Sequence, residues 1–443
     1  MGQLLKLSTL SRREAWGLLL LFGGCLGTLI NTLWNRFPPL LVFGAMAGFA
    51  FVLGYSMIRW IRPVFIKSGL GRRQMTRPNR PEALEYMGSL CGVLYLLSLV
   101  IFMPFAFYED IIAAALVDKA LNATVETKYI ESGRMLQWFP RSKLASYLFG
   151  ILSLQSIVIS GVMNELLQIQ WKYQALIRGL GFTPLLLASF MDFGDRQTGL
   201  PVPVEHIMSA IAVFLPVSSN TVADIEVVEV GQALIIALSL MANSILHLLT
   251  APPDSVPNGH WSSLYFLTPF IGISIALLYH AWYPSKVFVG HTYSYLAGTV
   301  FVIVGILGRC TKMLIILLIP QISNLLYASP QLLRLIPCPQ NTRPRVSPET
   351  GLLEASMFEW RVAPSPRIIL TLDTLNWMRL VRTRRNENGE VLESTNLTIP
   401  NLFLVWMGQM SEVQLVFGIL LIQCGCGLLV LVSHFSALRS YIY

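Results

Sequence analysis

The chain has 443 residues, of which 54% are hydrophobic and only 13% are charged. Soluble domains carry about 25% charged residues, so this composition excludes a disordered protein and argues against an ordinary soluble enzyme. It indicates a polytopic membrane protein, and the net charge of +8 then favours basic loops over anionic lipid, with no nucleic-acid partner. The six cysteines lie mostly in apolar runs and form no disulfide framework or zinc-binding pattern.

Apolar runs of about twenty residues, the length that crosses a bilayer, recur along the sequence. We expect spans at 16–34, 39–58, 86–107, 145–163, 175–191, 205–217, 232–250, 264–281, 294–309, 311–328 and 413–434. The run at 205–217 is short and the break after 309 is tight, so an all-α fold with ten to eleven transmembrane helices is expected. The first run follows Lys6, Arg12 and Arg13 and lacks a cleavage site, which indicates a signal anchor.

The spans divide the chain into four parts. These are a signal-anchor segment at 1–38, a multi-span core at 39–334, a cytosolic loop region at 335–412, and a final helix with its tail at 413–443.

The positively charged loops set the orientation. Seven Arg and Lys residues between positions 59 and 80 place the loop after the second span in the cytosol. Alternation then puts 109–144 in the lumen, where Asn122 is a candidate N-glycosylation acceptor. The same alternation puts Asn396, a second acceptor sequence, on the cytosolic side, where it should stay unmodified.

Polar side chains gather in the segments that this orientation places on the cytosolic face. Carboxylates near hydrocarbon are costly, so Glu165, Asp224 and Glu226 are candidate functional groups, together with His291. Each also has an ordinary interpretation: Glu165 extends into the interface, the other two acids are loop charges, and His291 is a structural residue beside Gly290. No nucleophile triad, P-loop or GxGxxG motif is present, so the residues alone leave the chemistry of this site open.

From about residue 40 onward, the motifs in these segments resemble those of a known family. The matching stretches are Phe139–Pro140, Gly231–Gln232, Leu278–His280, Trp282–Gly290, Ala297–Gly298, Val304–Gly308, Pro330–Leu332 and Pro337–Pro339. They resemble the eukaryotic UDP-GlcNAc–dolichyl-phosphate GlcNAc-1-phosphotransferases, the fungal forms most nearly. The resemblance implies a multi-pass enzyme of the endoplasmic reticulum membrane, whose cytosolic-face loops bind UDP-GlcNAc and a polyprenyl acceptor. It also allows a homodimer.

The resemblance breaks at the family's catalytic positions. Its Asp-Asp pair is Asn164–Glu165 here, its magnesium-binding Asp is His291, and its Arg-His-Arg clamp is 340–342, Gln-Asn-Thr. Gly71 and Gln74 stand where the family has an Asp and a Lys. Magnesium prefers hard oxygen ligands, and its ligands in the family are substituted here. We therefore name no metal-binding residue, and Mg²⁺ as a cofactor stays open. Phosphoryl transfer needs such a cation, so the ordinary family activity is not expected.

Other family positions are retained. Phe288, whose family counterpart stacks on uracil, is kept, as are Asn220 and Trp171. Arg343 and Arg345 lie close in sequence to the missing clamp and are candidates for binding the pyrophosphate. These five residues form the expected nucleotide-sugar site.

Three functions remain open. The first is a diverged UDP-GlcNAc-dependent membrane glycosyltransferase that transfers GlcNAc to a hydroxyl of a lipophilic acceptor, a terpenoid or lipid alcohol, in fungal specialised metabolism. Asp224, Glu226, His291 and Glu165 would then be the catalytic candidates, since a carboxylate or imidazole can accept the hydroxyl proton. The second is an inactive paralogue that acts as a binding or regulatory partner. The third is residual GlcNAc-1-phosphotransfer with Glu165 and Asp224 as substitute metal ligands.

Overall fold

The computed structural model describes most of the chain, and everything below concerns those residues. They are 11–34, 39–67, 71–72, 83–84, 87–107, 141–167, 169, 171–191, 225–250, 259–283, 287–308, 310–333, 335–337, 343–360, 364–387 and 389–435. The expected span at 205–217 and the candidates Asn122, Asn220 and Asp224 lie outside them.

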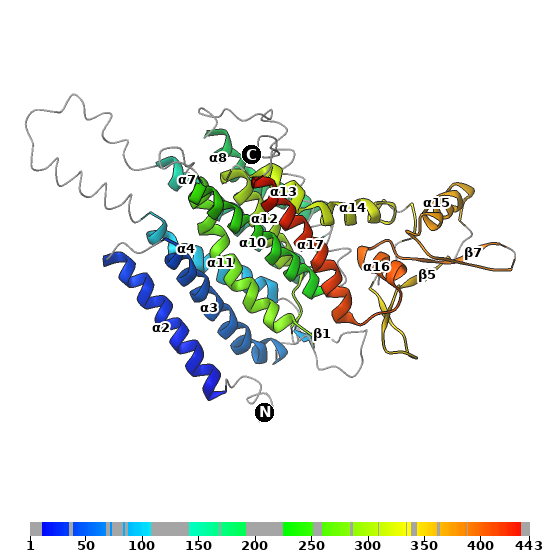
Figure 1. Cartoon of the computed structure of the whole chain (residues 1–443), viewed down its shortest axis with the longest axis horizontal. Coiled ribbons are helices and arrows are strands. Elements are labelled where there is room, and N and C mark those ends of the chain that lie inside the picture. Colours follow the sequence, from blue (N-terminus) through cyan, green and yellow to red (C-terminus); the bar gives the residue numbers. More distant parts are fainter. Residues whose placement is uncertain are drawn as a thin grey trace, which may run out of the picture.

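Apolar helices packed side by side form the body of the molecule (Figure 1). They are α2 (Arg12–Trp34), α3 (Pro39–Lys67), α4 (Met87–Ala106), α7 (Arg141–Leu167), α8 (Trp171–Met191), α10 (Glu226–Thr250), α11 (Gly259–Ala281), α12 (His291–Leu307), α13 (Thr311–Leu317), α14 (Ile319–Leu332) and α17 (Glu412–Phe435). In the described ranges, seven are long and apolar enough to cross a membrane, or eight if α13 and α14, bent by 60°, count as one span.

This architecture is that of a polytopic helical membrane protein, but the described residues do not reach the expected ten to eleven spans. The expected spans at 175–191 and 294–309 correspond to shorter apolar stretches, Leu176–Leu187 of α8 and His291–Leu307 of α12. By length and composition alone, these two apolar stretches are too short to count as membrane spans.

Helix α11 lies at the centre of the bundle and approaches α3 closely. A Cβ atom on Gly272 would come within 2.2 Å of the Ala47 carbonyl oxygen, and one on Gly54 within 3.2 Å of the Ala276 Cβ. Van der Waals packing between small residues is a principal attraction between helices in lipid, where the hydrophobic effect is absent. On another face of α11, the buried Tyr95 hydroxyl donates to the Phe266 carbonyl at 3.0 Å.

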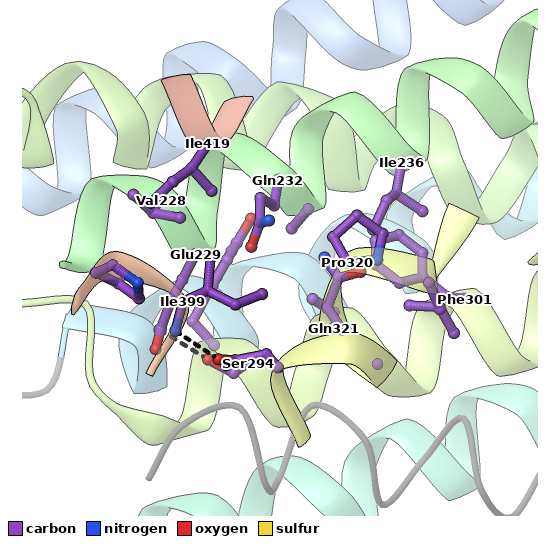
Figure 2. A pocket seen from close by; sticks show the side chains of 17 residues that line it. Val228, Glu229, Gln232, Ile236, Ser294, Phe301, Pro320, Gln321, Ile399 and Ile419 are labelled. Atoms are coloured by element: carbon purple, nitrogen blue, oxygen red, sulfur yellow. Dashed lines mark hydrogen bonds between the residues drawn. The ribbon is translucent and has the colours of Figure 1, made fainter. Parts of the chain in front are cut away.

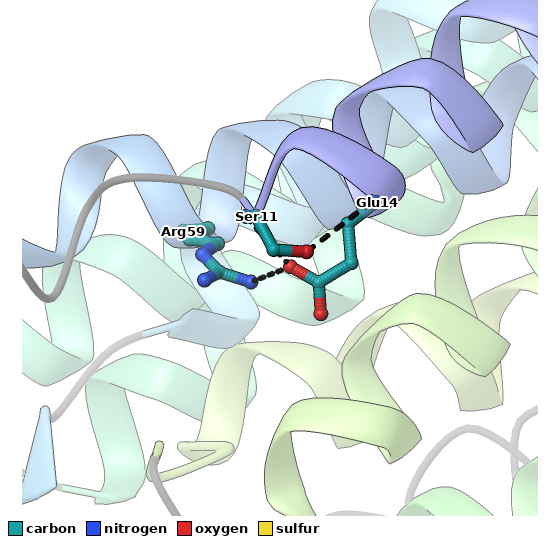
Figure 3. Close-up of polar contacts among 3 residues, drawn as sticks. All are labelled: Ser11, Glu14 and Arg59. Atoms are coloured by element: carbon teal, nitrogen blue, oxygen red, sulfur yellow. Dashed lines mark hydrogen bonds and ion pairs between the residues drawn. The ribbon is translucent and has the colours of Figure 1, made fainter.

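The first described helix starts with a capping box. The Ser11 amide donates to the Glu14 carboxylate at 3.1 Å, and the Glu14 amide donates to the Ser11 hydroxyl at 3.3 Å. Arg59 near the end of α3 forms a salt bridge with the same carboxylate at 3.3 Å (Figure 3). An exposed pair of this kind contributes at most about 1 kcal/mol. Helix α2 nevertheless packs on α3, with the Phe22 and Phe49 rings 5.4 Å apart.

The expected cytosolic loop region, 335–412, contains a small α/β unit. It contains a hairpin, β3 (Arg345–Val346) with β4 (Leu353–Glu354), and an antiparallel sheet of order β5-β7-β6 (Met357–Glu359, Val391–Thr395, Thr383–Arg385). Helices α15 (Pro366–Trp377) and α16 (Ile399–Met407) complete it. Its own buried core consists of Ile336, Phe358, Leu372, Val381, Val391 and Leu397. A further short pair, β1 (Gly71–Arg72) with β2 (Ala83–Leu84), lies in the basic loop.

Buried amide side chains attach this unit to α14. Gln331 of α14 donates to the Asn396 side chain at 3.2 Å and accepts from the Leu397 amide at 3.0 Å. Asn324, also of α14, accepts from the Ile399 amide at 3.0 Å. The Asn396 amide group in turn donates to the Ser356 hydroxyl at 2.6 Å. Satisfied buried polar groups of this kind fix one arrangement, since losing a partner costs about 1–3 kcal/mol.

Burial of Asn396 predicts that this acceptor sequence carries no glycan. Only 1% of the Asn396 surface is exposed, and its amide nitrogen is bonded to Ser356. Peptide mass spectrometry of the full chain purified from a glycosylating yeast host should show Asn396 unmodified. A glycan on the Asn396 peptide would contradict this packing.

Candidate functional site

The segment that precedes α12 is held against the start of α4. The Gly88 amide donates to the Val289 carbonyl at 2.7 Å, and the Met87 amide donates to the Phe288 carbonyl at 3.4 Å. A Cβ atom on Gly88 would stand 2.4 Å from the Val289 oxygen, so only glycine permits this approach. Gly290, the N-cap of α12, has a φ of 77°, a left-handed conformation that also favours glycine.

Glu165 binds the N-terminus of α12 from the end of α7. Its Oε1 accepts the Thr292 amide at 2.8 Å, and only 7% of the residue is exposed. A carboxylate is stabilised there by the helix dipole and by the otherwise unpaired amides of the first turn. Gly161, one turn earlier on α7, leaves room for this contact because its Cβ would fall 2.8 Å from the Thr292 side chain. The structure thus gives Glu165, a catalytic candidate, a positioning contact.

Two arginines and two aromatic rings lie near His291, the first residue of α12. The Arg343 guanidinium lies 5.5 Å from the centre of the Phe288 ring, and that of Arg178 lies 4.4 Å from the centre of the Tyr295 ring. The His291 and Tyr295 rings are stacked at 6.5 Å. The structure therefore brings together three residues singled out from the sequence, Phe288, His291 and Arg343.

Arg178 was not identified from the sequence. Only 2% of this residue is exposed, and Gln174 one turn earlier fixes its guanidinium by accepting from Nε and Nη2, each at 3.0 Å. Its Nη1 is buried and has no hydrogen-bond partner in the described part of the chain. A buried guanidinium with an unused N–H is suited to an anionic ligand. In the sequence, the one feature that could have identified Arg178 is its charge within the apolar run at 175–191.

The surroundings of His291 favour its neutral form. Part of the side chain is open to solvent, yet the packed protein around the helix end desolvates the ring, which is the largest cause of its lowered pKa. The positive charges of Arg343 and then Arg178 lower this pKa further below the ordinary 6.5. A neutral imidazole can accept a proton at physiological pH.

The side chains at the family's metal-binding positions do not fit a magnesium ion. Asn164 receives a hydrogen bond from Gln174, Glu165 binds a backbone amide, and His291 lies near two guanidinium groups. Among the described residues, no three His, Cys, Asp or Glu side chains are grouped as a metal site requires. Glu165 is the one carboxylate of these three side chains and already accepts the Thr292 amide, so the set offers fewer hard oxygen ligands than magnesium prefers.

An apolar cavity of about 80 Å³ adjoins α12 one turn beyond His291 (Figure 2). Glu229 lies at one end, where it accepts the Ser294 hydroxyl at 2.9 Å, and Ile236 and Phe301 lie toward the other. The further lining comes from α10, α12, α14, α16 and α17. Glu229 was not among the candidate site residues, although it too is a carboxylate at the start of an apolar helix.

The remaining candidates are not part of this cluster as described. Arg345 lies in the small α/β unit, where its guanidinium donates to the Met357 carbonyl at 3.0 Å. Trp171 and Glu226 begin α8 and α10, but their side chains lie outside the description. Asn220 and Asp224 lie outside it altogether. The roles given to these five residues stay predictions.

An apolar helical bundle with two arginines beside His291 and an apolar cavity next to the same helix defines an integral membrane protein with a polar cluster adjoining an apolar hollow. Residues 147–309 match the family model described as glycosyl transferase family 4. The chain is 33% identical over 417 residues to the UDP-N-acetylglucosamine–dolichyl-phosphate N-acetylglucosaminephosphotransferase of Saccharomyces cerevisiae, covering 90% of this chain and 92% of that one. It is 31% identical to the enzyme of the same name from Schizosaccharomyces pombe, over 90% and 93%.

A third such enzyme, from Dictyostelium discoideum, is 31% identical over 66% of this chain and 70% of its own length. The chain belongs to this family of UDP-N-acetylglucosamine–dolichyl-phosphate N-acetylglucosaminephosphotransferases.

Replacing Gly88 by alanine should displace the Phe288–Gly290 segment and destabilise the protein by about 1–3 kcal/mol, because the new methyl group overlaps the Val289 carbonyl. The matched control is Gly44→Ala on α3, where a Cβ meets nothing within 4 Å. Thermal unfolding of both variants in detergent measures the effect. Equal midpoints for the two variants would contradict the close approach at Gly88.

Proposed function

We propose that this chain is a UDP-GlcNAc-dependent membrane glycosyltransferase that transfers GlcNAc itself, without its phosphate, to the hydroxyl of a lipophilic acceptor. The observation that carries this proposal is the presence of His291, whose surroundings favour the neutral imidazole, near the guanidinium groups of Arg343 and Arg178. Such a site suits a leaving nucleoside diphosphate and a proton acceptor. It is poorly suited to a metal-assisted attack on phosphorus, which needs carboxylate ligands.

The donor would bind between the two arginines. Phe288 offers a ring face for the uracil, and the adjacent Arg343 offers charge-assisted hydrogen bonds to the diphosphate. Arg178 contributes its unused Nη1. Arg345, Asn220 and Trp171 remain proposed contributors to the same nucleotide-sugar site, with Arg345 requiring rotation away from Met357.

The reaction proposed is a single displacement at the sugar. The acceptor hydroxyl gives its proton to an imidazole nitrogen of His291, and its oxygen forms a bond to the anomeric carbon. The bond from that carbon to the diphosphate oxygen breaks, and its electron pair leaves on UDP, whose added charge the two guanidinium groups stabilise. His291 then returns its proton to solvent. Asp224 and Glu226 are alternative proton acceptors, whereas Glu165 positions the helix that carries His291.

The acceptor would occupy the apolar cavity beside α12. A terpenoid or lipid alcohol matches its lining, and Glu229 with Ser294 supplies polar groups for the hydroxyl end. The relatives are named for dolichyl phosphate, so a polyprenyl chain is the related alternative.

We place the enzyme in the endoplasmic reticulum membrane with this site facing the cytosol, in fungal specialised metabolism, and expect Asn122 to be the glycosylated sequence. A homodimer and membrane-lipid contacts are compatible with this assignment.

The identity of the product tests the proposal. Membranes containing the chain are incubated with labelled UDP-GlcNAc and a panel of terpenoid and long-chain alcohols, and products are identified by mass. A GlcNAc-alcohol with inverted anomeric configuration is expected, because a single displacement inverts the carbon. A GlcNAc-pyrophosphoryl lipid would indicate residual phosphotransfer. If no product forms and UDP-GlcNAc does not bind, the chain is an inactive paralogue. Either result contradicts the proposal.

The pH profile tests the roles of His291 and the arginines. The proton acceptor must be neutral, so kcat/KM should rise with pH and reach a plateau, with a midpoint below 6.5. Arg343→Gln removes a neighbouring positive charge, so it should move this midpoint upward. It should also lower kcat/KM by roughly 10- to 100-fold through lost charge-assisted bonds.

Arg384→Gln is the matched control, because that exposed guanidinium pairs with Glu393 in the α/β unit, and its profile should equal that of the unmodified chain. The roles fail if Arg343→Gln leaves the midpoint in place, or if both variants change it alike.

A further inference from the structure

One face of α15 carries large apolar side chains that the protein does not cover. Leu370 is 67% exposed, Trp377 86% and Met378 58%. Leu370, Thr374 and Trp377 are spaced to lie on one side of the helix. On the other side, Leu372 is buried in the core of the α/β unit. Helix α15 is thus amphipathic, with an apolar stripe facing outward.

The end of α16 extends this apolar surface. Trp406 is 55% exposed and Met407 66%. The Trp406 indole N–H donates to the Arg379 carbonyl at 2.9 Å, so the two chain segments are adjacent. The tryptophan patch is defined here as Leu370, Trp377, Met378, Trp406 and Met407.

The turn that ends α15 adds a cation at the edge of the patch. The Leu380 amide donates to the Leu375 carbonyl at 2.8 Å and the Arg379 amide to the Asn376 carbonyl at 3.0 Å, which is a Schellman ending. Arg379 has a φ of 56°, a position where glycine is usual and another residue costs about 1 kcal/mol. An exposed arginine therefore stands beside the two tryptophans at a site where local geometry alone would favour glycine.

The patch is tied to a membrane helix. The Tyr327 hydroxyl of α14 donates to the Leu380 carbonyl, one residue past Arg379. Helix α14 belongs to the bent apolar pair that is long enough to span, and it leads from the bundle toward α15 (Figure 1). Its exposed Leu326 (67%) and the following Leu333 (70%) give the bundle an apolar outer surface at this point. The tryptophan patch thus lies on a unit that is hydrogen-bonded to an apolar helix with exposed leucines.

We propose that the tryptophan patch inserts into the headgroup region of the bilayer, in the leaflet on the side of the α/β unit. Tryptophan is enriched at this depth because its ring is apolar while its N–H is polar, and arginine pairs with lipid phosphates there. An amphipathic helix buries its apolar face about 5–10 Å into this boundary. Bilayer contact would therefore hold the α/β unit from outside, while the amide contacts to α14 hold it from inside. This inference does not depend on the proposed function.

Quenching by brominated lipid tests the insertion in the full chain. The protein and its Trp377→Phe variant are reconstituted into vesicles of phosphatidylcholine with a minority of phosphatidylserine, with either ordinary or upper-chain-brominated phosphatidylcholine. The emission of Trp377 is obtained by subtracting the spectrum of the variant from that of the unmodified protein. Most of this emission should be lost in the brominated vesicles. Trp360→Phe is the control, because that half-buried indole donates to Ser394 inside the same unit and should be quenched little.

Phenylalanine keeps an aromatic ring at both positions, and circular dichroism verifies the fold of each variant. Quenching of Trp377 as weak as that of Trp360, with the emission wavelength of an exposed indole, would overturn the proposal and place the patch in water. Blue-shifted Trp377 emission without quenching would overturn it as well, and would indicate a second copy or another protein as the covering surface.

Discussion

The N-terminus of α12 is fixed by a carboxylate from α7 and by the backbone at the start of α4, and the site depends on these contacts. Glu165 accepts the Thr292 amide, and Gly88 donates to Val289. Phe288 and His291 lie on either side of the segment held in this way. A shift of one helix would therefore separate the ring face from the imidazole, and glycine at 88 and 161 is needed because a Cβ would force such a shift.

The same contact explains how a diverged site can keep its shape. A carboxylate that binds a helix terminus contributes through the dipole and the free amides of that helix, with no metal required. Around it, an amide and an imidazole stand at positions where the resemblance gives the family acids, and two guanidinium groups lie near that imidazole. The chain matches the family over 90% of its length, while an amide and an imidazole replace two of the acids that the resemblance implies at this site. Such a change alters which anion is stabilised and leaves the packing of the bundle intact.

The sequence predicts the parts of the fold that depend on local properties. Hydropathy over about twenty residues located α3 and α11, because crossing lipid demands a continuous apolar run. Motif resemblance located Phe288, His291 and Arg343. The contact of Glu165 with Thr292 joins residues 127 apart and could not be read from either one.

The α/β unit was missed because its strands are only two to five residues long and its amide contacts, such as Gln331 with Asn396, join distant segments. Arg178 lay inside a run assigned wholly to lipid.

Binding of UDP to the purified full chain in lipid nanodiscs tests most directly whether the chain binds a nucleotide without a metal ion. Isothermal titration would be performed once with EDTA and once with excess Mg²⁺. If the two guanidinium groups hold the diphosphate, the two Kd values should agree within about twofold. Binding that appears only with Mg²⁺, or that tightens more than about tenfold, would mean that the chain still assembles a metal site, and would contradict the assignment of a metal-independent nucleotide site.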